Sequence, residues 1–213
     1  MMNLLTLFDF ILTQRIMDGF ERKKQLLERL KPVRGQDEYL TDDLKNNLIS
    51  NFFPSDTSEL VTGLSNVTSA FYGFLLRDAA NMVGLDKISE LSENLFYLLG
   101  KFKAQQAMEK QDLPKDMRAF AIVGVFAIYT SSPEYSFTIR KFTEDHTVLY
   151  VSGVDRYHKM SQQLGISSYL NWPAAYSFMK GINDALQLRA KIEFELSPFD
   201  KDSNCGCLYE FTR

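Results

Sequence analysis

The chain has 213 residues, of which 45% are hydrophobic and 24% are charged, and its formal net charge at pH 7 is -3. This composition is ordinary for a soluble globular protein and excludes an intrinsically disordered chain. The slight acidity argues against a nucleic-acid binder, because such proteins present a concentrated basic face to the phosphate backbone.

The number of cysteines and the first twenty residues indicate in which cellular compartment the protein is expected. Two cysteines are too few for the disulfide framework of a small secreted protein. The apolar residues 1–20 are interrupted by Asp9 and lack a basic leader and a small-residue cleavage site, so we expect no signal peptide. No stretch reaches the roughly 18–20 uncharged apolar residues that span a bilayer. We therefore expect a cytoplasmic protein without a transmembrane segment.

The first predicted element is a long amphipathic helix over residues 3–30, ended by Pro32 and Gly35. Apolar side chains recur there about every four residues, which places them on one helical face. An apolar face on a terminal helix must be covered by its own domain or by a partner, so we expect a homodimer or a protein partner. The members of this face are Leu4, Phe8, Leu12, Ile16, Phe20, Leu26, Leu27 and Leu30.

Three further helices are predicted before residue 110. Thr41, followed by two aspartates, is typical of the cap and acidic first turn of a helix that stops before Pro54. The next helix spans about residues 58–83, with Gly84 placed as its stop. Another covers about residues 88–109. The N-terminal half is therefore expected to be helical.

The middle of the chain changes from helix to strand. Residues 116–130 are almost continuously apolar, and their length favours a buried helix over a strand. After Pro133, residues 135–142 and 146–153 are rich in β-branched and aromatic side chains and are separated by a polar turn. This pattern predicts a β-hairpin.

The last elements are predicted to be a helix and a second hairpin. Asn171 and Pro173 mark the start of a helix over residues 171–186. Residues 189–197 alternate between apolar and charged side chains, and residues 207–211 supply the expected partner strand. The fold class is therefore α+β, with a helical N-terminal half and a small antiparallel sheet of two hairpins.

The turn of that second hairpin raises the question of a calcium site. Asp200, Asp202 and Asn204 match the first three ligand positions of an EF-hand loop. Cys205 stands where the loop needs glycine, and Phe211 stands where it needs the bidentate glutamate. Because Asp, Ser, Asn and Gly also favour turns, these residues predict a hairpin turn better than a calcium loop.

Cys205 and Cys207 are candidates for a metal or redox site. If the segment is extended, both side chains project to the same face and could bind one metal. A structural zinc site needs four ligands, and neither His146 nor His158 forms a local motif with them. The alternatives are a redox pair, which usually has two intervening residues, and two small hydrophobic side chains in a sheet. We therefore predict no metal site.

Catalysis has weak candidates in the sequence. Asp155, Tyr157 and His158 form a polar cluster just after a predicted strand, and Cys207 could add a thiol. A hydrolase or reductase would use these groups for acid–base or nucleophilic chemistry. A structural histidine at a strand end is the alternative. No triad, metalloprotease, Walker or dinucleotide motif occurs.

Large aromatic side chains close to glycines could form the walls of an apolar ligand cavity. The alternative for each of them is core packing. The candidate ligand-binding residues are Phe96, Phe102, Phe120, Tyr157, His158, Trp172 and Tyr176.

Residues 90–213 resemble the vinyl-reductase-like (4-vinyl reductase) domain, which is related to TRAPP-type trafficking subunits and to aminothiazoline-carboxylate hydrolase-like proteins. The segments LFYLLGKFKAQQA, YSFTIRKFTEDHTVLYVSG and KIEFELSPFDKDSNCGCLYEF carry the resemblance. Cys207 and Tyr209 match the cysteine and aromatic residue that follow the family's acidic turn. Asp155 and Arg156 replace a cysteine that many members have after the second strand.

The resemblance implies a ligand-binding part at residues 90–213. Residues 1–89 lie outside the resemblance, and we expect them to form a helical part that packs on the same core and can dimerise. The resemblance implies binding of a small, largely apolar ligand, with tetrapyrroles of the chlorophyll type among the ligands. The role would be that of a sensor, carrier or assembly factor in pigment metabolism. A hydrolase or reductase of a small heterocyclic substrate and a scaffold subunit remain as alternatives.

Overall fold

The computed structural model describes residues 19–213. The chain divides into two compact units, residues 1–64 and residues 65–213. Most of the long apolar stripe predicted for the first helix, from Leu4 to Ile16, lies outside the described residues. No helix within residues 19–213 is long and apolar enough to cross a membrane.

The described part of the first unit is helical. Residues 19–29 form a helix, followed by α2 (Lys31–Arg34) and α3 (Asp42–Phe52). Pro32 was predicted to end the first helix, but it lies in the first turn of α2, where a missing N–H costs nothing. The cap of α3 is confirmed, because the backbone N–H of Leu44 donates to Oγ1 of Thr41 over 3.2 Å.

Five helices of eight residues or more are described beyond residue 56. They are α4 (Thr57–Val83), α5 (Ile88–Lys110), α6 (Arg118–Ser131), α7 (Arg156–Gln163) and α8 (Ala175–Leu186). Two short 3-10 turns, Leu85–Lys87 and Ser167–Tyr169, precede α5 and α8.

The boundaries of these helices confirm most of the sequence predictions. Gly84 ends α4 with a φ of 96°, in the left-handed region that favours glycine. The last helix begins at Ala175, four residues later than predicted. The short helix α7 was not predicted, since its eight residues are mostly polar and too few to show an apolar period.

The two predicted hairpins join into one antiparallel sheet of order β1-β2-β4-β3. The strands are β1 (Tyr135–Phe142), β2 (His146–Val154), β3 (Lys191–Leu196) and β4 (Asn204–Thr212). The central pair is β2 and β4, where Leu149 lies opposite Tyr209 and Val151 lies opposite Cys207. The predicted α+β class is therefore confirmed.

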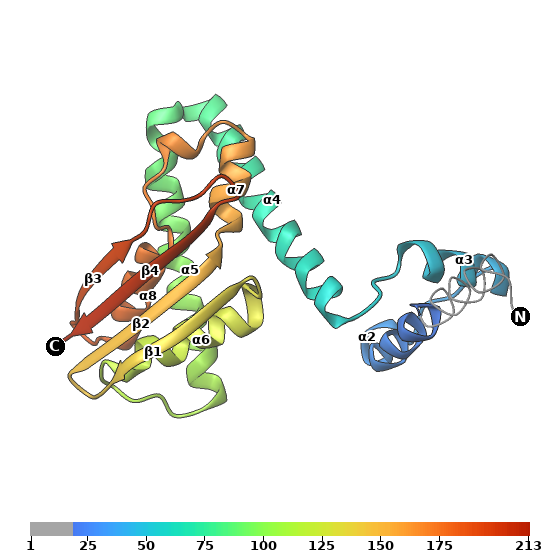
Figure 1. Ribbon diagram of the computed structural model, residues 1–213, viewed down its shortest axis with the longest axis horizontal. Helices are drawn as coiled ribbons and strands as arrows, with labels where there is room; N and C mark the ends of the chain where they lie inside the picture. The colour runs from blue at the N-terminus through green and yellow to red at the C-terminus, as the bar shows by residue number, and fades with distance from the viewer. Residues whose placement is uncertain (1–18) are drawn as a thin grey trace, which may run out of the picture. The chain divides into compact units, whose positions relative to one another are not determined.

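Helices α5, α6 and α8 lie on one face of the sheet (Figure 1). Helices α5 and α8 cross at Gly100 and Gly181, and a Cβ at either glycine would lie under 3.0 Å from a backbone oxygen of the other helix. The helix backbones therefore touch. Beneath them, the ring of Phe120 on α6 stacks on Phe211 of β4, with centroids 4.1 Å apart. This pair fixes one end of the core.

Candidate functional site

A cavity of about 110 Å³ lies between the inner face of the sheet and helices α5, α6 and α8. Its apolar wall includes Phe96 and Leu99 on α5, Phe178 and Met179 on α8, and Leu149 on β2. An apolar cavity of roughly 150 Å³ can hold a molecule of the size of benzene. The space therefore suits a small ligand.

Small residues on α6 keep this space open. Gly124 and Ala127 face the sheet where larger side chains would fill the gap. A Cβ added at Gly124 would lie 3.2 Å from Cδ2 of Leu149 and 3.6 Å from Cε of Met179. Side chains larger than those of glycine and alanine on this face of α6 would therefore reduce the space of the cavity.

One part of the cavity wall is polar and centres on Asp155. Its Oδ1 caps α7 by accepting the backbone N–H groups of Tyr157 (3.0 Å) and His158 (2.9 Å). Tyr135, another wall residue, donates its hydroxyl to the same carboxyl. Burial raises the pKa of Asp155 in spite of these hydrogen bonds, which lower it. The neutral acid is therefore favoured there more than in water.

Cys205 and Cys207 both line the cavity, as expected for alternate residues of a strand. Burial raises the pKa of Cys205 to about 12 and that of Cys207 to about 11. Both thiols are therefore neutral at physiological pH, whereas nucleophiles and metal ligands are thiolates. Within residues 19–213, no group of three or more His, Cys, Asp or Glu side chains could hold a metal ion.

The acidic segment before these cysteines forms a turn. Oδ1 of Asp200 accepts the backbone N–H groups of Asp202 and Asn204, each over 2.8 Å. Its Oδ2 accepts the side-chain amide of Asn204 over 2.9 Å. Both carboxylate oxygens thus hold the loop between β3 and β4, as the turn interpretation predicted.

Lys103 is the basic residue of the cavity wall. Only 9% of it is exposed, and its Nζ donates to Oγ1 of Thr130 over 2.9 Å. The ammonium also lies 5.2 Å from the centre of the Phe126 ring. Burial, and then the positive charge of Lys110, lower the pKa of Lys103.

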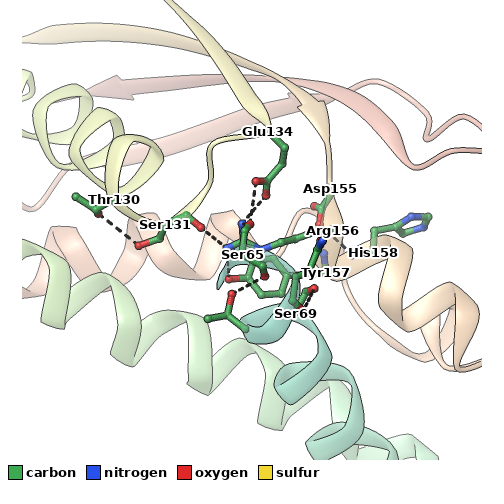
Figure 2. A network of polar contacts seen from close by, with 11 residues as sticks. Ser65, Ser69, Thr130, Ser131, Glu134, Asp155, Arg156, Tyr157 and His158 are labelled. Carbon is green, nitrogen blue, oxygen red and sulfur yellow. Dashed lines mark hydrogen bonds and ion pairs between the residues drawn. The ribbon is translucent and has the colours of Figure 1, made fainter. Parts of the chain in front are cut away.

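A buried network around Arg156 supports the polar side of the cavity (Figure 2). The guanidinium donates to Oε1 of Glu134 (2.6 Å), the hydroxyl of Tyr157 (2.9 Å), Oγ of Ser65 and the backbone oxygen of Ser131. Ser131 and Tyr157 line the cavity. Arg156 therefore ties α4, the end of α6 and the start of α7 together beside the site.

His158 lies on the side of α7 where it contacts the β3–β4 turn. Its ring stacks on Phe199, with centroids 3.7 Å apart, and its Nδ1 lies 2.9 Å from Oγ of Ser203. Burial lowers its pKa. His158 is not part of the cavity wall, whereas Asp155 and Cys207 are.

The candidate ligand-binding residues fall into two groups. Phe96 and Tyr157 line the cavity. The others lie elsewhere: Phe102 is 51% exposed on α5, and Phe120 belongs to the core. Trp172 packs with His158 and Phe199, and Tyr176 packs against Phe194.

Several wall residues were not predicted, and some of them had a readable signal. The alternation of β4 places Tyr209 on the same face as Cys205 and Cys207. The same rule groups Leu149 with Val151 on β2. No local signal marks Lys103, because its burial depends on α6, which comes later in the chain.

A comparison of the chain with models of known protein families, with curated proteins and with solved structures finds no match.

Proposed function

We propose that this protein binds a small, largely apolar molecule in the cavity of residues 65–213. The observation that carries the proposal is a cavity of about 110 Å³ with apolar walls and a few polar groups. Ligand sites typically combine apolar walls with a few polar groups that orient the ligand. Asp155 and Tyr135 supply such groups on one side and Lys103 on another.

The size of the cavity limits the size of the ligand that it can hold. Sites for drug-sized ligands typically measure about 300–1,000 Å³, well above the 110 Å³ found here. A tetrapyrrole with its four pyrrole rings would need the walls to move apart. The cavity thus favours a ligand close to one aromatic ring in size, and the tetrapyrrole and pigment-metabolism role stays a prediction.

The test is a binding experiment with the full-length protein and single-ring aromatic probes. We expect at least one probe to raise the melting temperature and to shift the methyl NMR signals of Leu149 and Met179. Ala127→Leu adds three carbons to the cavity wall and should weaken binding. Ala79→Leu makes the same change on α4, at a half-buried position away from the cavity, and should leave binding intact.

The proposal fails if no probe binds the wild-type protein. It also fails if Ala127→Leu binds as well as Ala79→Leu, because the ligand would then lie elsewhere. Thermal unfolding without ligand shows whether both variants remain folded, so a loss of binding can be separated from a loss of structure.

The scaffold alternative has one observation in its favour. The large apolar side chains that are exposed on α4 include Val67, Phe71, Phe74 and Leu75. Residues 60–76 contain no charged side chain, so two copies could pair there without like-charge repulsion. Sedimentation equilibrium tests this second candidate: a dimer that Phe71→Glu dissociates supports it, and a wild-type monomer refutes it.

A further inference from the structure

We propose that the ligand of the cavity is a small apolar carboxylic acid, bound as the anion with its carboxylate on the ammonium of Lys103. The inference rests on the proposed binding function and specifies the chemical class of the ligand. The apolar part of the acid lies against Phe96 and Leu99, which line the cavity together with Lys103.

The first argument is that Lys103, a residue that is mostly buried, has no anionic partner among residues 19–213. Lys103 is 9% exposed, and its one hydrogen bond goes to the neutral hydroxyl of Thr130. Its ammonium also lies 5.2 Å from the centre of the Phe126 ring. Among residues 19–213, no carboxylate pairs with it, and the charge that acts on it comes from Lys110, which is also positive. Buried charges in proteins are normally paired.

The other strongly buried cation of the same unit follows this rule. Arg156 is 5% exposed, and its NH1 lies 2.6 Å from Oε1 of Glu134. Lys103 has no such carboxylate partner among residues 19–213. A ligand carboxylate would supply it, and an ammonium has three donors, of which Thr130 takes one.

The second argument is the arrangement along α5. Phe96, Leu99 and Lys103 are separated by three and four residues, so they lie on one helical face. An acid lying along this face can place its ring on the two apolar side chains and its carboxylate on the ammonium. The geometry thus fits an amphipathic anion in one orientation.

The third argument concerns the other ionisable group in the wall. Asp155 would repel an anion if it were charged, but burial raises its pKa and favours the neutral acid. Its carboxyl is also held by Tyr135 and by the backbone of α7. The repulsion that opposes an anionic ligand is therefore reduced.

The experiment compares benzoate with benzamide, which has nearly the same shape and no charge. Isothermal titration is carried out on the wild-type protein, on Lys103→Met and on Lys101→Met. Methionine keeps the length of the side chain and removes the charge. Lys101 lies on the same helix outside the cavity wall, so its variant controls for a general loss of positive charge.

We expect wild type and Lys101→Met to bind benzoate more tightly than benzamide by about tenfold or more, as for a charge-assisted hydrogen bond. Lys103→Met should lose this preference and keep its affinity for benzamide. Equal binding of the two probes by wild type overturns the inference and leaves the proposed function standing. A preference that persists in Lys103→Met overturns the role of Lys103. Failure of both probes, and of other single-ring probes, overturns the binding function itself.

Discussion

The buried pair of Arg156 and Glu134 gives the sharpest stability prediction. The side chain of Arg156 is 6% exposed and that of Glu134 is 20% exposed. Replacing Arg156 by methionine leaves the carboxylate of Glu134 without its cation and removes the donors to Ser65, Ser131 and Tyr157. Breaking a buried ion pair from one side typically costs about 3–5 kcal/mol.

For a unit of this size, each kcal/mol shifts the melting temperature by roughly 2–4 °C. Arg156→Met should therefore lower the melting temperature by about 6–20 °C, measured by circular dichroism on the full chain. Urea unfolding of the same samples gives the change in free energy directly. The exposed pair of Lys191 and Glu193 is the control, and Lys191→Met should cost about 1 kcal/mol or less.

A second variant separates the loss of the pair from the loss of the arginine's packing. In the double variant Arg156→Met with Glu134→Leu no carboxylate is left unpaired, so it should be more stable than Arg156→Met alone. The reasoning is refuted if Arg156→Met costs less than about 1 kcal/mol. It is also refuted if the double variant is no more stable than the single one.

Three further predictions concern packing, pH and thiol chemistry. Gly181→Ala should destabilise the protein by about 1–3 kcal/mol or more in urea unfolding, because its Cβ would meet the backbone of α5; Gly63→Ala, in open space on α4, should not destabilise it. Burial raises the pKa of Asp155 in the folded state above its unfolded value, so its contribution to stability is complete below the unfolded pKa and is lost as pH rises through the folded pKa. Asp155→Asn has no carboxyl to ionise, and its amide oxygen can still cap α7. Its free energy of unfolding relative to wild type should therefore rise with pH between the unfolded and folded pKa values of Asp155. A difference that does not change with pH would contradict the raised pKa of Asp155. Cys205 and Cys207, with pKa values raised to about 12 and 11, should react with iodoacetamide at pH 8 far more slowly in the folded protein than in urea, and equal rates would show that they are not buried thiols.

Local chemistry accounts for the parts of the fold that were predicted. Thr41 caps α3 because a hydroxyl next to the first free N–H groups needs no tertiary partner. Gly84 stops α4 because only glycine adopts its φ of 96° without strain. The two hairpins, β1–β2 and β3–β4, were predicted from strands rich in β-branched, aromatic or alternating apolar residues that flank polar turns. Such signals act over a few residues and can therefore be read from the chain.

The candidate site was predicted only in part, for a physical reason. Tyr157, Phe96 and Cys207 were identified as candidates, but a residue's type does not reveal whether it faces a cavity or the core. Phe120 has the same aromatic character as Phe96 and fills the core against Phe211. Whether an aromatic side chain lines the cavity or fills the core depends on which helix or strand packs against it. That packing is determined by contacts between segments that are distant in the sequence.

The sequence by itself determined the α+β class, most helix and strand boundaries, and the turn at residues 200–204. Only the tertiary structure decided that β2 pairs with β4, which brings Val151 opposite Cys207. Only the tertiary structure shows that Lys103 is mostly buried next to α6 and that His158 lies outside the cavity wall. Hydrogen bonding and side-chain periodicity are local, whereas the burial and pairing of charges depend on which segments meet in space.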